Sequence, residues 1–596
     1  MWLVCLALSV ACVIFVPLAS LFISDSSFGR SRKFNLFNSL FGGVFVAALF
    51  MFFPVHMSVA GADLWGVIRS VFLSVFNSMQ IFAIGCEFGV VAESMPYCPE
   101  WLAAPYNAWV ALLFVMAPVF TFGFVLSLFK NLSAYLKYLG AYFKNVYVFS
   151  ELNEKSLTLA KDIKKREQAA AIVFCGVFSQ DGELSHELIR SAYELGAIRM
   201  KQDIVSFDFS KHQAATAITF FAMGADETEN LDFALKLIEK YKDRPSTRLY
   251  VFSTQIECEL LLATAAKGEM KVRRINEVES LVERVLYERG EIIFETAKEL
   301  PDGKRKICAV VVGMGSHGTE MLKALSWFCQ MDGYSLEIHA FDKDPLAEER
   351  FTAESPELMS PVYNGVEIPG EAQYSITVHP GVDVESATFA REISKLSDTT
   401  YVMIALGNDS VNVKTAVNMR MYFERMKIHP KIQTIIYNSR QKKALEGIKN
   451  FKGELYNIEF LGDTESSYTC DVILDSDLEE EALARHLKCG EAEEFWTYEY
   501  NYRSSVASAL HMRARIKCGI PGADKAEEEL SEAERATIEV LEHKRWNAYM
   551  RAEGYVYSGS PDKSSRNDLG KMHHDLVDFD SLTEEEKRKD GSVGSR

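Results

Sequence analysis

The stretch "VVVGMGSHGTE", residues 310 to 320, places three glycines directly after a run of valines. Gly313, Gly315 and Gly318 have the spacing G-x-G-x-x-G and lead into a helical pattern. In such a loop the first glycine permits a tight turn, the second lets a phosphate approach the backbone, and the third allows close packing of helix on strand. The helix N-terminus adds partial positive charge. The sequence therefore predicts a strand, a loop that binds a nucleotide phosphate, and a helix.

The residues around this loop extend the expected site. Ser316 and His317 lie at the helix start, and the next strand ends at Asp342, 24 residues past Gly318, where a carboxylate would accept hydrogen bonds from ribose hydroxyls. A later run, "TTYVMIALGNDSVNVKTAV", repeats the strand–loop–helix form with Asn408 in its loop. The expected ligand is a nucleotide or an NAD-type cofactor. Two alternatives stay open: the glycines only pack a helix on a strand, and His317 is a solvent-facing turn residue.

From residue 145 onward, short apolar runs rich in β-formers alternate with helical stretches, which is typical of α/β domains. Two tandem Rossmann-like domains are predicted, over residues 145 to 300 and 305 to 490. In the first, the strand "NVYVFS" is followed by "ELNEKSLTLAKDIKK" without intervening glycines. We therefore expect the first domain to have the fold without the usual dinucleotide grip, and the second domain to contain the ligand site.

The N-terminal part, residues 1 to 132, has the composition of a membrane domain of three or four spans. Residues 1 to 24, 36 to 60 and 102 to 129 are each apolar and long enough to cross a bilayer. The first segment lacks the positive n-region of a signal peptide, so we expect a retained helix. Residues 133 to 144 interleave tyrosines with lysines, as expected of an interfacial linker.

Residues 66 to 91 are apolar but contain Arg69, Asn77, Gln80 and Glu87. On one helix Arg69, Gln80 and Glu87 would fall within about 20° of one another, so one stripe would be polar. The stripe either locks helices together or lines a water-filled path. Basic residues at 30 to 33 and at 130 to 144 both favour the cytoplasmic side, which four full spans do not allow, so residues 66 to 91 are the candidate for a re-entrant or pore-lining segment.

Charge and cysteine content narrow the function classes. The chain of 596 residues has a formal net charge of −18, and all of the acidic excess lies beyond residue 145. An acidic protein repels phosphate backbones, so no nucleic-acid polymer is expected as a partner. The 11 cysteines include no C-x-x-C pair, which favours a reducing cytosol and gives no motif for a metal site. No set of catalytic residues is visible, so we expect no enzyme activity.

The chain has predicted membrane spans followed by two Rossmann-like domains, and it contains the motifs "VVVGMGSHG", "AFDKDP" and "YVMIALGNDSVNVKTAV". In these features it resembles membrane proteins with RCK domains, which regulate potassium conductance. The resemblance covers roughly residues 145 to 490. It implies paired units that bind nucleotides or ions and assemble into homo-oligomers, here dimers or tetramers of RCK-like pairs. The chain departs from potassium channels in having no T-V-G-Y-G filter.

The C-terminal residues 505 to 596 are predicted to form a small, mostly helical domain. Residues 536 to 553 have the pattern of one helix closed by Gly554. About 60 residues resemble the RyR domain, the repeat named after ryanodine receptors, through His543, Trp546, Arg551, Gly554, Tyr555, Asp562, Lys571, His573, Leu576 and Val577. Tyr555 stands where a tryptophan is common, and His574 and Asp578 stand where prolines are expected.

The RyR resemblance implies a pocket for a small, nucleotide-derived ligand. Aromatic residues there would stack on a base and basic residues would contact phosphate. The alternative is that Trp546 and the tyrosines form the core of the domain. The candidate residues are His543, Trp546, Tyr549, Arg551, Tyr555, Tyr557, Lys563, Arg566, Lys571 and His573.

Together these parts predict a ligand-gated membrane effector in which a nucleotide-type signal binds the RyR-like or RCK-like domains and alters membrane permeability. The resemblances imply a multi-pass protein of a bacterial inner membrane, with residues 133 to 596 cytoplasmic, and a role in anti-phage defence or nucleotide signalling. Three alternatives are an RCK-regulated potassium or cation channel or transporter subunit, a membrane-anchored NAD-dependent oxidoreductase, and a membrane-anchored scaffold.

Overall fold

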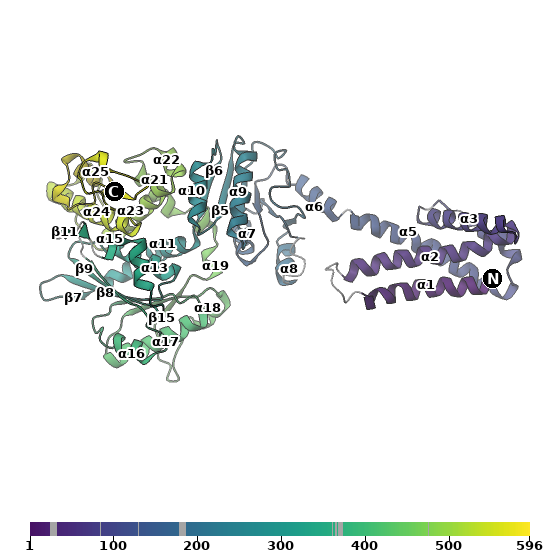
Figure 1. The fold of residues 1–596 in the computed structure, drawn as a ribbon, viewed down its shortest axis with the longest axis horizontal. Coiled ribbons are helices and arrows are strands. Elements are labelled where there is room, and N and C mark those ends of the chain that lie inside the picture. The colour runs from purple at the N-terminus through teal and green to yellow at the C-terminus, as the bar shows by residue number, and fades with distance from the viewer. Residues whose placement is uncertain are drawn as a thin grey trace. The chain divides into compact units, whose positions relative to one another are not determined.

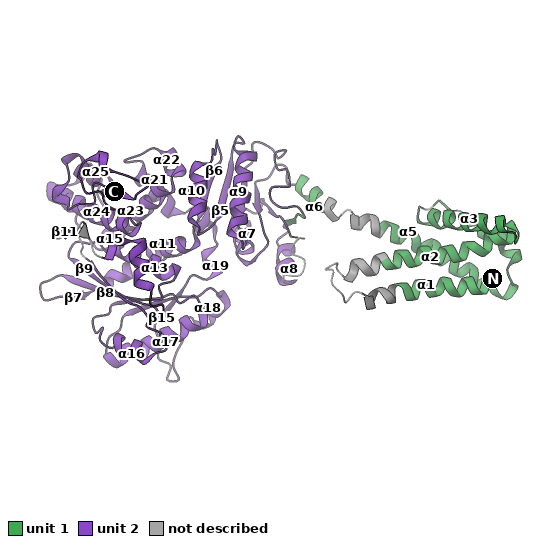
Figure 2. Ribbon diagram, viewed as in Figure 1, with its two compact units in different colours: residues 1–140, 177–185, 198–201 green, residues 141–176, 186–197, 202–596 purple. Residues whose placement is uncertain are grey.

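The structure is a computed structural model that describes residues 1–23, 32–83, 85–86, 88–128, 130–177, 186–359, 362–363, 366–367, 374–474 and 476–595. Its elements are labelled in Figure 1, and Figure 2 colours its two compact units. Unit 1 comprises residues 1–140, 177–185 and 198–201, and unit 2 comprises the rest of the chain. The two units are described separately.

Up to residue 140, the described residues of unit 1 are mostly helical. The helix α2 packs against α1, α3 and α5, and its small residues Ala47 and Ala48 are fully buried in the contact. The elements are α1 (Trp2–Ile23), α2 (Arg32–Ala60), α3 (Leu64–Phe82), α4 (Gly89–Ser94), η1 (Met95–Tyr97), α5 (Glu100–Leu128), α6 (Lys130–Leu139) and the short strand β3 (Ile198–Arg199).

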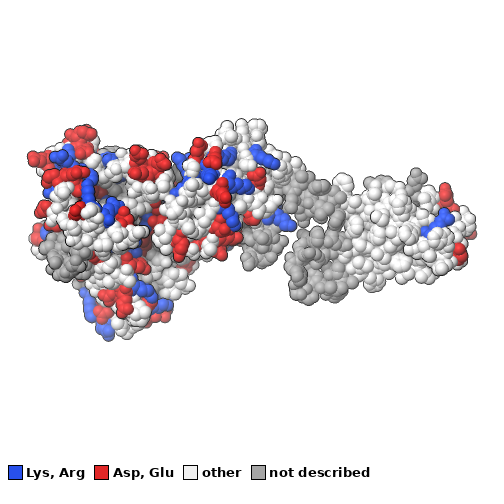
Figure 3. Space-filling view, turned by 45° about the horizontal axis from the view of Figure 1, so that its top comes forward, with Lys and Arg blue, Asp and Glu red and all other residues white. Residues whose placement is uncertain are grey.

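Two helical segments of unit 1 are long and apolar enough to cross a membrane, Ser39–Ala60 and Glu100–Phe122, and Trp2–Val16 is a shorter apolar helix. Figure 3 shows this part of the chain almost bare of charged side chains except at one end. Length and composition thus agree with the membrane helices predicted at residues 36 to 60 and 102 to 129.

The prediction of one continuous polar stripe over residues 66 to 91 is wrong. The helix α3 ends at Phe82, so helical geometry no longer relates the later residues to Arg69. Arg69 is exposed and Gln80 is half-buried, whereas Glu87 lies outside the described residues. Asn77 is 7% exposed, and its Nδ2 lies 3.0 Å from Nε2 of His56 on α2. At Asn77 the polar side chain therefore ties two helices together.

Unit 2 begins with an α/β domain whose parallel sheet has the order β2-β1-β4-β5-β6. Its central strands are buried on both faces, which is why they are continuously apolar. The strands are β1 (Val146–Phe149), β2 (Ala171–Phe174), β4 (Ile218–Ala222), β5 (Thr247–Phe252) and β6 (Lys271–Ile275). The helices are α7 (Glu154–Arg166), α8 (His186–Glu194), α9 (Glu227–Tyr241), α10 (Ile256–Thr264), α11 (Glu277–Arg289) and α12 (Glu291–Glu295).

The second α/β domain has a parallel sheet in the order β12-β9-β8-β13-β14-β15, with β7 (Lys298–Glu299) antiparallel on β8. The strands are β8 (Arg305–Val312), β9 (Tyr334–Phe341), β12 (Tyr374–His379), β13 (Tyr401–Ile404), β14 (Lys431–Ile435) and β15 (Ile458–Leu461). This is the doubly wound, Rossmann-like order, in which the strand order reverses between the parallel neighbours β8 and β13. The predicted α/β class is confirmed for both domains.

Helices cover both faces of this second sheet. Figure 1 shows α16 (Ala387–Ile393) and α17 (Asp409–Met426) on one side, and α11 and α13 (Ser316–Phe328) on the other. The shorter elements are α14 (Ala347–Glu354), α15 (Pro356–Met359), the hairpin β10 (Val362–Tyr363) with β11 (Val366–Glu367), α18 (Ser439–Leu445), α19 (Thr464–Ser467) and α20 (Cys470–Ile473).

The C-terminal module of unit 2 is mostly helical, and its long helix α24 packs on α13. The predicted helix 536 to 553 is found as α24 (Glu532–Ala552), and Gly554 follows it with φ +83°. The other elements are α21 (Asp477–His486), α22 (Ala492–Thr497), α23 (Glu499–Lys517), α25 (Glu584–Gly594), the strand pair β16 (Val556–Tyr557) and β17 (Met572–His573), and the 3-10 turns η2 (Glu527–Glu529), η3 (Lys563–Ser565) and η4 (Phe579–Ser581).

Candidate functional site

The glycine loop has the backbone that its sequence predicts. Gly313 follows β8 with φ +93°, and a Cβ at this position would lie 2.5 Å from the carbonyl oxygen of Ala405. A Cβ at Gly318 would lie 1.7 Å from the carbonyl oxygen of Gly313, whereas a Cβ at Gly315 would meet no heavy atom within 4 Å. The first and third glycines are therefore required for packing. Gly315 leaves open space at the exposed end of the helix.

The helix α13 starts without a side-chain cap, because its N-cap residue is Gly315. Ser316, the first helical residue, is exposed. Backbone N–H groups in the first turn of a helix have no partner within the helix, and they bind anions when no side chain caps them. This end of α13 is therefore suited to a phosphate.

Asp342 lies at the end of β9, as predicted, but both of its oxygens already accept backbone hydrogen bonds. Oδ2 accepts from the amide of Met314 inside the glycine loop at 2.6 Å, and Oδ1 accepts from the amide of Asp344 at 2.8 Å. The carboxylate thus holds the loop in shape. A ribose would have to share it with the Met314 amide.

His317 and Asn408 have local partners at the same edge of the sheet. His317 is half-buried, and its Nδ1 lies 3.4 Å from the hydroxyl of Tyr437. Burial lowers the pKa of His317, so the imidazole is neutral at pH 7. Asn408 is the N-cap of α17 and accepts from the amide of Val411 at 3.1 Å. Neither side chain adds a fixed positive charge to the loop.

A cavity with a volume of about 380 Å³ lies in the C-terminal module, among α21, α23, α24, α25 and the segment 563–575. Half of the ten RyR candidate residues line it: His543, Trp546, Lys563, Arg566 and His573. Tyr500 lines it as well, so two half-buried aromatic side chains face the same space.

Buried positive charge accumulates beside this cavity. Arg485, Arg515 and Arg545 are 7%, 0% and 2% exposed, and Glu542, at 1%, is the only comparably buried carboxylate in the described residues of the module. Glu542 accepts from Arg515 Nη2 at 2.8 Å and from Arg545 Nη2 at 2.7 Å. Despite burial, these two guanidiniums lower the pKa of Glu542 to about 2, so it stays ionised.

Two of the three guanidiniums line the cavity, where an anion can contact them. Arg545 lines the cavity, and its Nη1 has no hydrogen-bond partner. Arg485 also lines the cavity and is held by neutral carbonyl groups, including that of Ser595 at 2.7 Å from Nη2. Burial and the neighbouring Arg515 lower the pKa of Arg485 to about 10, which still leaves it charged at pH 7. The buried lining therefore has an excess of positive charge.

Besides Glu542, the lining includes the acidic residues Glu494, Asp575, Glu586 and Asp590 and the basic residues Lys563, Arg566 and Lys589. Glu586 lies 2.9 Å from Lys563 Nζ and 2.8 Å from Lys589 Nζ, and Asp590 lies 3.2 Å from His543 Nδ1. With Arg485 and Arg545, the formal charges of the whole lining cancel, and the positive excess is confined to its buried guanidiniums.

Two histidines, His573 and His574, also line the cavity, and a histidine ring nitrogen donates or accepts a hydrogen bond according to its protonation. The rings of His573 and His574 stack at 4.7 Å, and neither nitrogen of the buried His574 makes a hydrogen bond. Burial, then Arg566 and His574, lower the pKa of His573 to about 4, so this ring is neutral at pH 7. A bound anion would favour the protonated form of His573.

The other five RyR candidates do not line the cavity: four join the module to the second α/β domain or lie within its core, and the fifth, Lys571, is exposed. Tyr549 packs on Trp327, and Arg551 is 1% exposed with its Nε 3.7 Å from Glu357. The remaining three are Tyr555, buried near Tyr500; Tyr557, whose amide donates to Glu357; and Lys571, whose Nζ donates to the carbonyl of Glu553.

Several residues of the cavity were missed by sequence reasoning: Arg485, Tyr500, Glu542, Arg545, His574 and Lys589. Arg545 and Glu542 stand three positions apart on one helix, which by spacing alone looks like an ordinary surface ion pair. His574 was noticed only as a departure from the RyR pattern. Only burial distinguishes these charged residues from ordinary surface residues, and burial was not visible in the sequence.

No model of a known protein family matches the chain, and no curated protein matches it.

Proposed function

We propose that the protein is a ligand-gated membrane effector, in which an anionic nucleotide-type molecule binds the cavity of the C-terminal module and thereby alters membrane permeability through residues 1 to 132. The observation that carries the proposal is the excess of buried positive charge, with Arg485, Arg515 and Arg545 set against Glu542 alone. Uncompensated buried charge costs several kcal/mol. A phosphate in the cavity would supply the compensating negative charge.

The lining also supports a nucleotide over a simple inorganic anion. A cavity of about 380 Å³ is in the size range of small-molecule sites. Trp546 and Tyr500 offer aromatic faces on which a base can stack, while Arg545 Nη1 offers a donor to phosphate. The proposed ligand therefore combines at least one phosphate with an aromatic base.

The contacts of α24 support coupling between this cavity and the glycine loop. Trp327, on α13, packs edge-on against Tyr549 of α24 with ring centroids 6.2 Å apart. His511 Nε2, on α23, lies 2.7 Å from the carbonyl oxygen of Gln330, just after α13. A ligand that reorganises α23 or α24 would bias the helix that begins at the glycine loop.

The wider assignment rests on the resemblances. In this proposal the α/β domains are a tandem RCK-like pair, the C-terminal module is RyR-like, and the chain forms homo-oligomers in a bacterial inner membrane with residues 133 to 596 cytoplasmic. The physiological setting would be anti-phage defence or nucleotide signalling.

The uncapped start of α13 favours a second ligand site. A nucleotide or NAD-type cofactor bound at Gly315 would make the second α/β domain the sensor, which is the arrangement of an RCK-regulated channel or transporter subunit. The two sites can be separated by mutation, because Gly315 and Arg545 share no contact partner among the described interactions.

The test is ion flux from liposomes that contain the full-length protein, with ATP, NAD and a panel of linear and cyclic dinucleotides added on the cytosolic side. Arg545→Gln lowers the buried excess by one positive charge and leaves Arg515 paired with Glu542, so the fold should be retained. Arg588→Gln, an exposed arginine on α25 outside the cavity, is the matched control. Gly315→Asp tests the glycine loop.

We expect one nucleotide to trigger flux, with affinity about 10- to 100-fold weaker in Arg545→Gln and unchanged in Arg588→Gln, since a hydrogen bond to a charged group contributes about 1.5–3 kcal/mol. Loss of the response in Gly315→Asp alone would move the sensor to the glycine loop. A nucleotide that binds without causing flux in any condition would contradict the effector function and favour an anchored enzyme or scaffold.

A further inference from the structure

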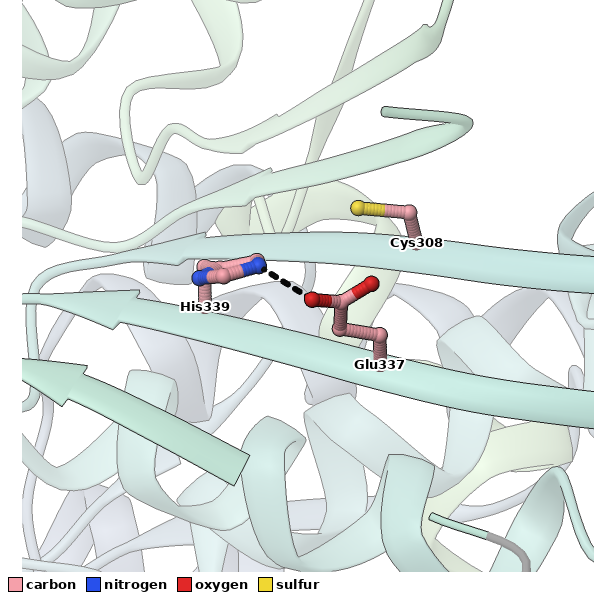
Figure 4. Close-up of side chains that lie close together, drawn as sticks. All are labelled: Cys308, Glu337 and His339. Atoms are coloured by element: carbon pink, nitrogen blue, oxygen red, sulfur yellow. Dashed lines mark hydrogen bonds and ion pairs between the residues drawn. The ribbon is translucent and has the colours of Figure 1, made fainter. Parts of the chain in front are cut away.

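A second cluster of chemically active side chains lies on the second sheet, away from the cavity. Cys308 on β8 and Glu337 on β9 are direct partners in the parallel register, and His339 follows Glu337 by two residues on the same face. Figure 4 shows the three side chains on neighbouring strands. One ligand atom of each, sulfur, oxygen and nitrogen, lies within 4.8 Å of the others.

The hydrogen bonds of His339 suit a metal ligand. Its Nδ1 lies 3.2 Å from Nε2 of His379 on the edge strand β12, and its Nε2 lies 3.0 Å from Oε1 of Glu337. A metal-binding histidine commonly donates its other ring N–H to a neighbouring acceptor, which fixes the tautomer. Without a metal ion, Nε2–H of His339 can donate to Glu337 Oε1 while Nδ1 accepts from His379. A metal ion at Nε2 would take the place of that proton, and Nδ1–H would then donate to His379.

Glu337 has a partner that would have to yield. Lys306 Nζ lies 2.5 Å from Glu337 Oε2 and also 3.7 Å from Asp398 Oδ2. When Glu337 turns toward a cation, the ammonium of Lys306 can pair with Asp398 and need not remain unpaired. Lys306 thus has an alternative ion pair, so releasing Glu337 need not leave a buried charge behind.

We propose that Cys308, Glu337 and His339 form a binding site for a divalent transition-metal ion of the zinc type, held by Cys308 Sγ, a Glu337 carboxylate oxygen and His339 Nε2. Zinc accepts thiolate, imidazole and carboxylate ligands at about 2.0–2.3 Å in tetrahedral geometry, and small side-chain rotations would bring the three atoms to that distance. With three protein ligands the fourth position goes to water, which can enter past the half-exposed Glu337.

Metal binding here would release a proton. Cys308 is 2% exposed, and burial raises the pKa of its thiol to about 11, so the metal must displace the thiol proton. Affinity should therefore rise with pH. The ion would also join β8 to β9 in the middle of β8, four residues before the strand ends at Val312, and so stabilise the second sheet.

The experiment is a cobalt titration of the full-length protein in detergent, after removal of metals with a chelator. A cobalt ion bound by a thiolate gives a sulfur-to-cobalt charge-transfer band that a site without cysteine cannot give. This matters because His573, His574 and Asp575 form another group that could hold a metal ion, and that group contains no sulfur. Zinc is then added to displace the cobalt.

We expect one equivalent of cobalt with the charge-transfer band, displaced by zinc and absent in Cys308→Ser. His379→Gln removes only the partner of His339 and should weaken binding about 10- to 100-fold. Cys518→Ser and His429→Gln, a cysteine and an exposed histidine outside the cluster, are the matched controls and should leave the band intact.

A wild-type protein without the band, or a band of equal strength in Cys308→Ser, would overturn the proposal. Because Cys308 is buried, loss of the band in its variant can also result from misfolding. Glu337→Gln therefore serves as the second variant, since this side chain is one-third exposed. It should keep the fold and lower cobalt affinity at least about 10-fold, and unchanged affinity would overturn the proposal as well.

Discussion

The two α/β domains share their strand order but differ at the turn after the first strand. In the second domain three residues, Gly313 to Gly315, separate β8 from α13, and the helix start has no side-chain cap. In the first domain four residues separate β1 from α7, and Asn153 caps the helix in a reciprocal capping box with Ser156. The same fold thus presents an open helix N-terminus in one domain and a closed one in the other, and only the open one can accept phosphate.

Elsewhere the two domains match in detail. Asn230 on α9 accepts from the amide of Gly224 at 2.6 Å and donates to the carbonyl of Phe252 at 2.9 Å. Asn412 on α17 accepts from the amide of Leu406 at 2.8 Å and donates to the carbonyl of Ile435 at 2.9 Å. Both asparagines join the end of one strand to the end of the next. The two domains therefore share the contacts that hold their sheets together, and they differ at the turn where a ligand would bind.

The largest expected effect concerns Gly318. A Cβ there would lie 1.7 Å from the carbonyl oxygen of Gly313, which cannot move without breaking the turn. We expect Gly318→Ala to destabilise the second domain by at least about 3 kcal/mol. Hydrogen exchange of the full-length protein, read separately for peptides of each α/β domain, measures the effect. Unchanged exchange in α13 would contradict the structure of the loop.

The paired asparagines should give two similar losses. Asn230→Leu and Asn412→Leu each remove a fully buried amide and leave a backbone N–H and a carbonyl without their partner. We expect about 2–4 kcal/mol for each, confined to its own domain, because an unsatisfied buried polar group costs about 1–3 kcal/mol. The check is hydrogen exchange in the two domains. A large loss of stability in one domain and none in the other would show that the two asparagines do not have equivalent roles.

The sequence could predict what depends on local pattern. The run of valines, the three glycines and Asp342 determine a strand, a turn and a second strand, and each was found where expected. The helix of the C-terminal module and its end at Gly554 followed equally from periodicity and a breaker. These features depend on neighbours in the chain, which the sequence displays.

What could not be predicted depends on tertiary burial. Arg551 and Arg545 look alike in the sequence, but Arg551 lies against Glu357 at a domain contact while Arg545 faces the cavity. The capping box of Asn153 depends on residues three positions apart, so the sequence contains it. The matching roles of Asn230 and Asn412 depend on neighbouring strands, so they are found only in the folded sheets. The prediction of a polar stripe was wrong because α3 ends at Phe82, where no proline in the sequence signals the end of a helix.

Glu320 gives the comparison a pH dependence, because it lies on the first turns of α13 and has no counterpart on α7. Burial and then the nearby Glu279 raise the pKa of Glu320 to about 8, against an ordinary value of 4.5. The folded state thus holds this proton more tightly than the unfolded state, so the carboxyl costs nothing below pH 4.5 and destabilises the fold increasingly up to pH 8.

Glu320→Gln should therefore be more stable than the parent protein at pH 8, by on the order of 1 kcal/mol or more, and equally stable near pH 4. Denaturant unfolding of the full-length protein at both values measures the difference. Glu348→Gln, an exposed carboxylate on α14, is the control and should show no such dependence. A difference that grows as the pH falls would have the wrong sign and would refute the assignment.

The smallest effects separate the two turns most directly. Asn153→Ala removes the cap of α7, whose Oδ1 accepts from the amide of Ser156 at 2.8 Å, and should destabilise the first domain by about 1 kcal/mol. Gly315→Ala, at the equivalent N-cap of α13, should change stability by only a few tenths of a kcal/mol, because the added methyl group meets open space and replaces no hydrogen bond.

Thermal unfolding with and without NAD distinguishes the two variants. If the second turn binds phosphate, Gly315→Ala weakens the NAD-induced shift although the fold is intact, whereas Asn153→Ala lowers stability and leaves the shift alone. An NAD-induced shift that survives Gly315→Ala unchanged would mean that the open turn, like the closed one, serves only to connect strand and helix.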